Sequence, residues 1–303
     1  MQYETAARIL RLFSANSATR QLYEWLGRAR GLVGRDQDIN WKYFWRTPML
    51  LEALRRHGIL TPGMRALEIG TGWFHWEALM LRNEVPCEVT LYDVVDKRRP
   101  TRMQRFLQQL SDSEVRERLG LENADGAALM QQAAAAASPA ELYEMLGFSY
   151  AADPSGKMPG LPDAAYDLLV SSDVGEHLIR DHIPDILRRW FEVTRPGGYG
   201  YHLIVLVDHL RIYAKDAHEK QYLTYDRQEF LGRINNAVQY VNTLQVPEYR
   251  EAFETAGFEI LEMTPVGTCD LDRIDVHPSW SDFSAEDLSC TVLQVVVRRP
   301  LQP

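Results

Sequence analysis

Cysteine is scarce in this sequence, and no two cysteines are spaced as a redox or metal-binding motif. Only Cys87, Cys269 and Cys290 occur in 303 residues, and no CxxC is present. Such a sparse, odd-numbered set argues against a disulfide framework and is typical of a reducing compartment. We expect all three to be buried small apolar side chains, because free cysteine is among the most buried residue types.

Long apolar runs are also missing. The beginning, MQYETAARILRLFSANS, has no basic region followed by an unbroken apolar core, so it does not predict a signal peptide. Stretches such as YHLIVLV are too short to span a bilayer. Together with the few cysteines, this predicts a cytoplasmic protein without a membrane partner.

Positive charge is in deficit, with a formal net charge of −9 at pH 7. Nucleic acids and anionic membranes favour basic surfaces, so the balance disfavours a nucleic-acid partner. The basic run DKRRPTRMQR is interpreted as a solvated helix face. A homo-oligomer is left open, because nothing in the sequence decides it.

Helical spacing of apolar residues dominates residues 1–60, which we interpret as an N-terminal helical cap. The pattern includes Ile9, Leu10, Phe13 and Trp25, and a further helix is predicted to begin at Thr47–Pro48. Residues 61–303 then predict one α/β domain. Strand ALEIG, helix WFHWEALMLRN and strand CEVTLYDV form a βαβ unit, which implies a parallel sheet.

Two stretches interrupt this alternation and are predicted to be insertions. Residues 97–146 are charged and then alanine-rich, which favours helix, and residues 210–246 are polar with many aromatics. Between and after them we expect the strands FSYAAD, YDLLVSS, YGYHLIVLV, FEILEM and SCTVLQVVVRR, with the helices HIPDILRRWFEVT and VPEYREAFETA. The turn RPGG and Gly257 supply the helix stops.

A glycine turn follows the first predicted strand. Gly70 and Gly72 remove Cβ atoms where backbone amides can face a ligand at a helix N-terminus. A dinucleotide fingerprint needs a third small residue, but His75 stands there, which weakens a nicotinamide interpretation. Glu68 would repel a pyrophosphate yet suit an ammonium group, and Asp93 ends the next strand where a ribose-binding acid belongs.

These segments, in this order, resemble the class I S-adenosylmethionine-dependent methyltransferases over residues 64–298. ALEIGTG resembles the first motif of that superfamily, VTLYDV the second, and YDLLVSSDVGEHL the fourth-strand segment. The resemblance implies a Rossmann-like, mostly parallel sheet of seven strands in the order 3-2-1-4-5-7-6, with strand seven antiparallel. It also implies S-adenosylmethionine as the cofactor.

The resemblance further implies roles for individual residues. Asp93 would hold the ribose hydroxyls beside Val94, Asp153 would meet the adenine amine, and Ser171 to Val174 would lie beneath the sulfonium. Arg46 could pair with the cofactor carboxylate or be an ordinary surface arginine. The predicted cofactor-binding set is Arg46, Glu68, Gly70, Thr71, Gly72, Asp93, Val94, Asp153 and Ser172.

Acid–base groups should come from the loops after strands four and five, because ligands bind at the carboxyl ends of the strands. We favour His209 as general base, with Asp208 or Asp173 as the carboxylate that orients it. His177 is the second choice for the base. His202 lies within a strand and is interpreted as a core histidine. A metal site of Asp173, Asp208 and His209 lacks tight ligand spacing, so no metal is predicted.

The last expectations concern the acceptor. Tyr240 and Asn242 are substrate-side candidates, with helix packing and capping as the alternative. QYVNTL resembles a stretch of bacterial methyltransferases from polysaccharide or secondary-metabolite clusters, which favours O-methylation of a small polar metabolite or sugar. The competing predictions are a non-catalytic S-adenosylmethionine-binding scaffold and, less favoured, a nicotinamide-dependent oxidoreductase.

Overall fold

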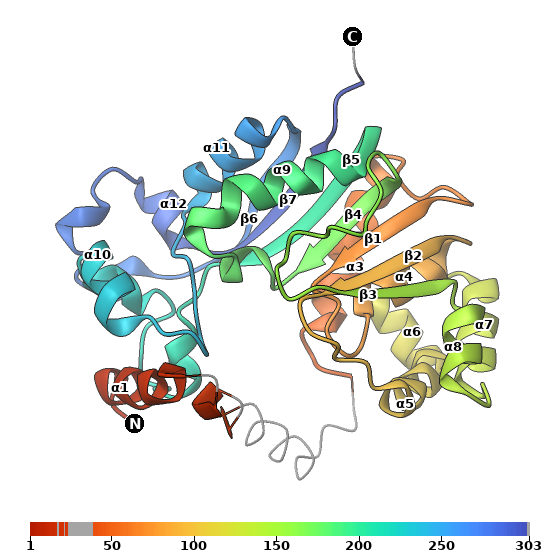
Figure 1. The fold of residues 1–303 in the computed structure, drawn as a ribbon, viewed down its shortest axis with the longest axis horizontal. Helices are drawn as coiled ribbons and strands as arrows, with labels where there is room; N and C mark the ends of the chain where they lie inside the picture. The colour runs from red at the N-terminus through yellow and green to blue at the C-terminus, as the bar shows by residue number, and fades with distance from the viewer. Residues whose placement is uncertain (17, 21, 24–38, 302–303) are drawn as a thin grey trace.

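The computed structural model describes residues 1–16, 18–20, 22–23 and 39–301. Its centre is a sheet of seven strands in the order β3-β2-β1-β4-β5-β7-β6 (Figure 1). Neighbours from β3 to β5 are parallel, and β7 is antiparallel to both β5 and β6. The predicted fold class and strand order are confirmed.

The strands coincide with the apolar segments of the sequence. They are β1 (Arg65–Ile69), β2 (Glu88–Asp93), β3 (Phe148–Ala152), β4 (Tyr166–Ser172), β5 (Thr194–Val205), β6 (Glu259–Thr268) and β7 (Cys290–Arg298). The central strands β1 and β4 are buried along almost their whole length, as continuous apolar runs in a parallel sheet require.

Helices cover both faces of the sheet, and each layer has its own apolar core. The helices α9 (Ile183–Val193) and α11 (Val246–Ala256) lie on one face, where Leu187, Trp190 and Phe253 pack against the strands (Figure 1). On the other face lie α3 (Tyr43–Arg56) and α4 (Trp76–Glu84). The two cores hold the sheet rigidly between them, which fixes the positions of the strand ends.

The segment predicted to be a helical insertion is helical. It forms α5 (Pro100–Leu110), α6 (Ser113–Leu119), α7 (Ala124–Ala134) and α8 (Pro139–Met145) between β2 and β3. In α5, Met103, Phe106 and Leu107 are buried on one side, so this charged sequence still has a core face. The second predicted insertion consists of short pieces: η3 (His209–Ile212), η4 (Gln221–Thr224), α10 (Arg227–Glu229) and η5 (Phe230–Ile234).

The first sixty residues contact two different parts of the molecule. Helix α1 (Tyr3–Ser14) packs against η3 and η5, in a third core with Tyr222 and Trp280, whereas α3 packs against α4 and α6 (Figure 1). The helical pattern expected across residues 17, 21 and 24–38 lies outside the described residues. The predicted start of α3 at Thr47–Pro48 was wrong. The helix begins at Tyr43 and continues through Pro48, at the cost of the one amide that proline lacks.

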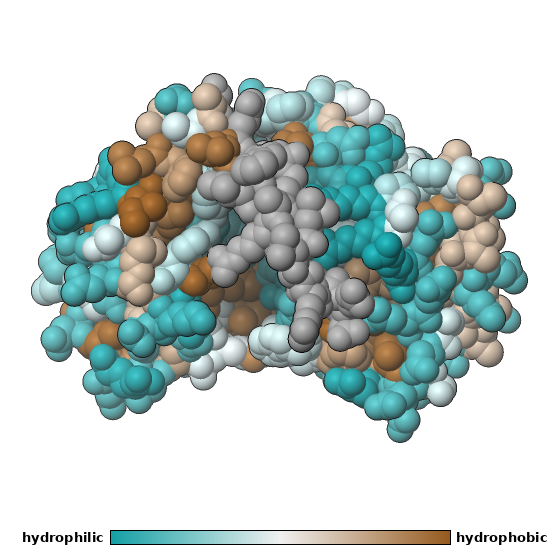
Figure 2. Space-filling view, turned by 90° about the horizontal axis from the view of Figure 1, so that it is seen from below, coloured by the Kyte–Doolittle hydropathy of each residue, from teal (hydrophilic) through white to brown (hydrophobic). Residues whose placement is uncertain are grey.

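The remaining pieces are η1 (Gly175–His177) and η2 (Arg180–His182) before α9, and η6 (Leu271–Arg273), η7 (Pro278–Trp280) and α12 (Ala285–Ser289) before β7. Figure 2 shows the molecule from below, with hydrophilic residues over much of both sides and a hydrophobic patch at the upper left. Across the described ranges, no helix has the length and apolar character needed to cross a membrane. Cys87, Cys269 and Cys290 are free; Cys87 and Cys290 are buried, as expected, and Cys269 is half-buried.

Candidate functional site

A sharp turn at Gly70–Gly72 links β1 to the segment before α4. The amides of Gly70 and Thr71 donate to the carbonyl of Tyr92 at 2.8 and 3.1 Å, and the Gly72 amide donates to the Asp93 carboxylate at 3.0 Å. Gly70 has a φ of 70°, and a Cβ built on it would lie 2.3 Å from Cγ2 of Val174. Only glycine therefore fits at position 70.

A cavity of about 200 Å³ opens beside this turn. Three segments line it: Lys42, Tyr43 and Arg46 from the start of α3, residues 70–77, and Ser172 and Asp173 after β4. A Cβ on Gly72 would meet nothing within 4 Å, so its backbone faces open space. The carboxyl ends of β1 and β4 thus border a crevice, as the doubly wound topology predicts.

Asp93 stands at the far end of the turn and is only 2% exposed. Besides the Gly72 amide, it forms an ion pair with Lys97 at 3.1 Å. Val94 beside it is 44% exposed, a rare surface position for valine next to a buried acid. Asp153 accepts hydrogen bonds from Ser155 and the Met158 amide, so its carboxylate organises its own loop.

Two buried carboxyl groups, Glu68 and Glu77, lie beneath the crevice. Glu68 accepts hydrogen bonds from the Thr71 hydroxyl at 2.9 Å and the Ala78 amide at 3.4 Å. Burial raises the pKa of Glu68 far above its usual range, and the charge of Glu77 adds to the rise. The pair therefore favours a cation above it, or shares a proton without one.

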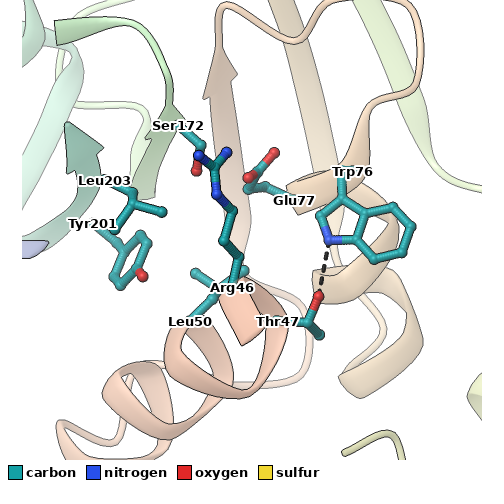
Figure 3. A pocket seen from close by; sticks show the side chains of 8 residues that line it. All are labelled: Arg46, Thr47, Leu50, Trp76, Glu77, Ser172, Tyr201 and Leu203. Atoms are coloured by element: carbon teal, nitrogen blue, oxygen red, sulfur yellow. Dashed lines mark hydrogen bonds between the residues drawn. The ribbon is translucent and has the colours of Figure 1, made fainter. Parts of the chain in front are cut away.

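Arg46 and Asp173 join the two sides of the crevice. The guanidinium donates two hydrogen bonds of 2.8 Å to the carboxylate, and Lys42 donates a third at 3.0 Å. Burial alone would raise the pKa of Asp173, but the hydrogen bonds and charges of Arg46 and Lys42 outweigh it and hold that pKa at about 2. Figure 3 shows Arg46 reaching from α3 to a place between Ser172 and Glu77.

The aromatic run after Gly72 serves both the core and the crevice. Phe74 and Trp76 are buried, and Trp76 stacks on Tyr43 with 4.2 Å between ring centroids. Its indole nitrogen donates to the Thr47 hydroxyl at 2.9 Å (Figure 3). The expected helix start near Trp73 was wrong: α4 begins at Trp76, because His75 has a φ of 55° and cannot be a helical residue.

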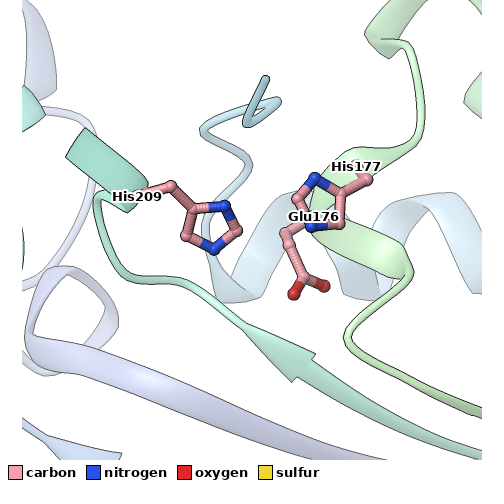
Figure 4. Close-up of side chains that lie close together, drawn as sticks. All are labelled: Glu176, His177 and His209. Carbon is pink, nitrogen blue, oxygen red and sulfur yellow. The ribbon is translucent and has the colours of Figure 1, made fainter. Parts of the chain in front are cut away.

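On the other side of Asp173, three side chains from two loops come together. Glu176 and His177 lie on η1 and His209 on η3, and one ligand-type atom of each lies within 4.8 Å of the others (Figure 4). The rings of His177 and His209 are 4.9 Å apart between centroids. The two histidines singled out by the sequence are therefore neighbours, after β4 and β5 respectively.

Asp208 does not orient His209, contrary to expectation. It is fully buried, and its carboxylate accepts hydrogen bonds from Tyr3 and the Leu210 amide, so it anchors α1 instead. Asp173 is also committed elsewhere, to Arg46 and Lys42. The carboxylate beside the two histidines is Glu176.

The two substrate-side candidates, Tyr240 and Asn242, form hydrogen bonds to residues 175–180, the segment that carries Glu176 and His177. Asn242 is 1% exposed and uses its whole amide within the fold, bonding to Gly175, Leu178, Leu244 and Tyr249. These contacts agree with the packing and capping alternative for Asn242. The carbonyl oxygen of Tyr240 accepts a hydrogen bond of 2.8 Å from His177, while its hydroxyl accepts one from the Arg180 amide.

Sequence reasoning missed Lys42 and Glu77 as crevice residues. Lys42 precedes Arg46 by four positions, a spacing that puts two cations on one side of a helix, and this signal was available. Glu77 had no comparable signal, because its importance depends on Glu68 lying under it. His202 is a buried histidine hydrogen bonded to Ser171, as interpreted.

The family model described as a methyltransferase domain matches residues 42–263. No curated protein matches the chain.

Several solved structures are similar to this chain at low identity. One, described as a candidate sarcosine dimethylglycine methyltransferase from Galdieria sulphuraria, has a TM-score of 0.48 at 14% identity, covering 84% of this chain and 85% of that one. A phosphoethanolamine N-methyltransferase 2 from Haemonchus contortus, in complex with phosphomonomethylethanolamine and S-adenosylhomocysteine, has a TM-score of 0.47 at 15% identity, covering 84% and 53%.

Proposed function

Because the chain belongs to the methyltransferase domain family, with S-adenosylmethionine as its cofactor, we propose that it transfers a methyl group to an oxygen atom of a small polar molecule. The observation that carries the proposal is the crevice at Gly70–Gly72, bordered by buried acids and lying next to two histidines. The bound cofactor supplies an electrophilic methyl group on a positively charged sulfur.

The residues of the crevice fit that cofactor. Open space in front of Gly72 admits a ligand against the backbone, and buried Asp93 suits a vicinal diol. Glu68 and Glu77 favour a cation, and Tyr43 and Trp76 line the same cavity. The two buried carboxyl groups would be out of place around a pyrophosphate.

Arg46 is proposed to hold the cofactor carboxylate while keeping its pair with Asp173. Its Nε is buried without a hydrogen-bond partner among the described residues, although its two terminal nitrogens are occupied. A guanidinium has five N–H donors and can serve two carboxylates at once. Asp173 has a φ of 57°, a strained value for a non-glycine residue, which suits a position held by function.

Beyond Asp173, the acceptor would lie against His177 and His209. In the metal-free protein, His209 is the proposed general base, with His177 as the second candidate. Burial, together with the charge of the neighbouring His177, lowers the pKa of His209 to about 4, so the imidazole is neutral at pH 7 and can accept a proton. The alternative of a catalytically silent binding protein differs only in turnover.

The experiment has two arms. Calorimetry should detect one S-adenosylmethionine per chain, and Gly72→Arg, which fills the open space at the turn, should abolish binding while the thermal unfolding transition is retained. Incubation with a metabolite extract should then give a product heavier by one methylene, seen by mass spectrometry. Binding unaffected by Gly72→Arg would refute the site, and binding without any product would favour the silent alternative.

A further inference from the structure

Glu176 is a buried acid whose oxygens lack partners. Glu176 is 2% exposed, and neither of its carboxylate oxygens has a hydrogen-bond partner in the part of the chain that the structure describes. The amides of Glu176 and Val205 are close enough to moderate its pKa without forming such a bond. Burying a carboxyl group without a hydrogen-bond or charge partner lowers stability, so the unpaired Glu176 indicates a missing cation or donor.

The neighbouring protein cations do not fill that role. Arg46 and Lys42 both donate to Asp173, which lies between them and Glu176. What does face the carboxylate is a pair of imidazoles. Figure 4 shows the rings of His177 and His209 opposite each other with the Glu176 carboxylate beside them.

The hydrogen bonds set the tautomer of His177. Its Nδ1 lies 2.8 Å from the carbonyl oxygen of Tyr240, which can only accept, so Nδ1 carries the proton. The lone pair is therefore on Nε2. Histidines that bind metals are commonly oriented in this way, by donating their other nitrogen to a carbonyl. His209 has neither ring nitrogen hydrogen bonded among the described residues, so one of them is available as a ligand.

From these contacts we propose that Glu176, His177 and His209 bind one divalent transition-metal ion. Two imidazoles and one carboxylate suit zinc, manganese, iron(II) or cobalt(II), whereas calcium and magnesium prefer oxygen ligands alone. The ligand atoms lie within 4.8 Å of one another. An ion with bonds of about 2.1 Å needs them about 3–4 Å apart, so small side-chain rotations close the site.

Three protein ligands leave coordination positions open, and the hydroxyl of the acceptor would occupy one of them. This step rests on the proposed methyl transfer. A hydroxyl bound at the open position loses its proton to water more easily, since a divalent ion lowers its pKa. The resulting oxyanion forms the O–CH₃ bond as the S–CH₃ bond breaks, giving a methyl ether and the neutral thioether. His177 and His209 then act as ligands, and the ion replaces His209 as the activating group.

The metal test needs neither cofactor nor acceptor. Protein treated with EDTA is titrated with cobalt(II), followed by visible d–d absorption, and with zinc by calorimetry. We expect one ion per chain, with binding weakened at least about tenfold in Glu176→Gln, His177→Ala and His209→Ala. His182→Ala is the matched control, because His182 is exposed and its side chain forms no cap hydrogen bond. If the parent protein bound no metal ion, or if a variant with all three substitutions bound it equally well, the proposed metal site would be overturned.

The role of the metal ion in methyl transfer is tested separately from metal binding. Cofactor affinity in each variant, measured without metal, reports on the fold and should stay within about threefold of the parent, since none of the three lines the crevice. Where a histidine variant unfolds, His177→Gln or His209→Gln replaces it. Metal-dependent turnover that these variants lose supports the role of the ion. Full turnover after EDTA treatment would refute that role yet leave the proposed function intact, whereas absence of cofactor binding by the parent protein would refute the proposed function and not the metal site.

Discussion

Two polar sites of similar composition lie on either side of Asp173. They differ in how many of their hydrogen bonds the protein itself supplies. On the crevice side, Glu68 is a buried glutamate that accepts two hydrogen bonds, and both nitrogens of His75 have partners in Thr71 and Tyr143. On the other side, Glu176 is equally buried but accepts none, and His209 has no partner among the described residues. The polar groups of the first site are hydrogen bonded within the protein, whereas those of the second are left unpaired and are proposed to bind a ligand.

The difference has a physical meaning. Buried polar groups are almost always hydrogen bonded, so a fold that leaves Glu176 unpaired while pairing Glu68 keeps the former available for a ligand. The crevice residues lie on the turn after β1 and on neighbouring backbone, and we propose that they bind the cofactor. Glu176, His177 and His209 come from the loops after β4 and β5, and we propose that they bind the metal ion and act on the acceptor.

The largest effect is expected at Gly70. Gly70→Ala places a Cβ 2.3 Å from Val174 Cγ2 and requires a φ of 70°, so the turn must shift. We expect S-adenosylmethionine to bind at least about 100-fold more weakly, a loss of about 2.7 kcal/mol by calorimetry. Gly63→Ala is the control, since its φ of 81° imposes backbone strain with no atom within 4 Å.

Relief of the clash sharpens the same test. Because Val174 supplies the colliding methyl group, the double variant Gly70→Ala with Val174→Ala should recover part of the lost affinity, while Val174→Ala alone changes little. Equal affinity in parent and Gly70→Ala would mean that the turn is not the cofactor site.

A smaller loss is expected from Arg46→Met. It removes two hydrogen bonds to Asp173 and the donor proposed for the cofactor carboxylate, so affinity should fall about 10- to 100-fold. Binding of 5′-methylthioadenosine, which lacks the amino-acid portion, should be affected far less. Arg55→Met, at a surface ion pair with Glu84, is the control. Equal losses for both ligands would make the role of Arg46 structural.

The contrast between the two glutamates is tested directly by paired substitutions. Glu68→Gln replaces one acceptor oxygen by a donor facing Thr71 and Ala78, and should lower the free energy of unfolding by about 1–3 kcal/mol. Glu176→Gln removes no hydrogen bond and should leave metal-free stability within about 0.5 kcal/mol of the parent or above it. Urea unfolding of both variants, with exposed Glu52→Gln alongside, measures the difference; a larger loss at position 176 would contradict it.

The same contrast explains what the sequence could and could not reveal. The turn at Gly70–Gly72 and the acid at Asp93 are encoded within one βαβ unit, where local pattern and topology agree, so the strand order and the crevice could be predicted. The second site combines residues 33 positions apart, Glu176 and His209. Topology brings their loops to one edge, but local backbone geometry decides which acid turns inward.

Asp208 shows why that choice escaped prediction. It is adjacent to His209 in sequence, yet its carboxylate points to Tyr3 on α1, and this contact spans 205 positions. No local pattern predicts where α1 docks. The start of α4 escaped for a related reason: His75 leaves the helical region because its ring bonds to Thr71 and Tyr143, and the second of these lies in a distant helix.

The smallest effect is expected at His202. Unlike His209, this histidine has a hydrogen-bond partner within the protein. Its Nδ1 lies 2.8 Å from the Ser171 hydroxyl, and its ring stacks between Trp190 and Phe253. Burial lowers the pKa of His202 from 6.5 to about 3. Below pH 6.5 the unfolded chain therefore takes up a proton that the folded chain does not, so stability falls with falling pH until about pH 3. The slope from this group approaches about 1.4 kcal/mol per pH unit.

Replacing His202 by phenylalanine isolates this contribution, because the ring stacking is kept and the titrating group is lost. Urea unfolding between about pH 7 and pH 4.5 should give a free energy that falls less steeply for His202→Phe than for the parent, by up to one proton's slope. The variant loses the Ser171 contact at all pH values, so the slopes and not the absolute stabilities are compared. Parallel slopes would mean that folded His202 also takes up the proton, and that burial of its ring between α9 and α11 does not exclude charge.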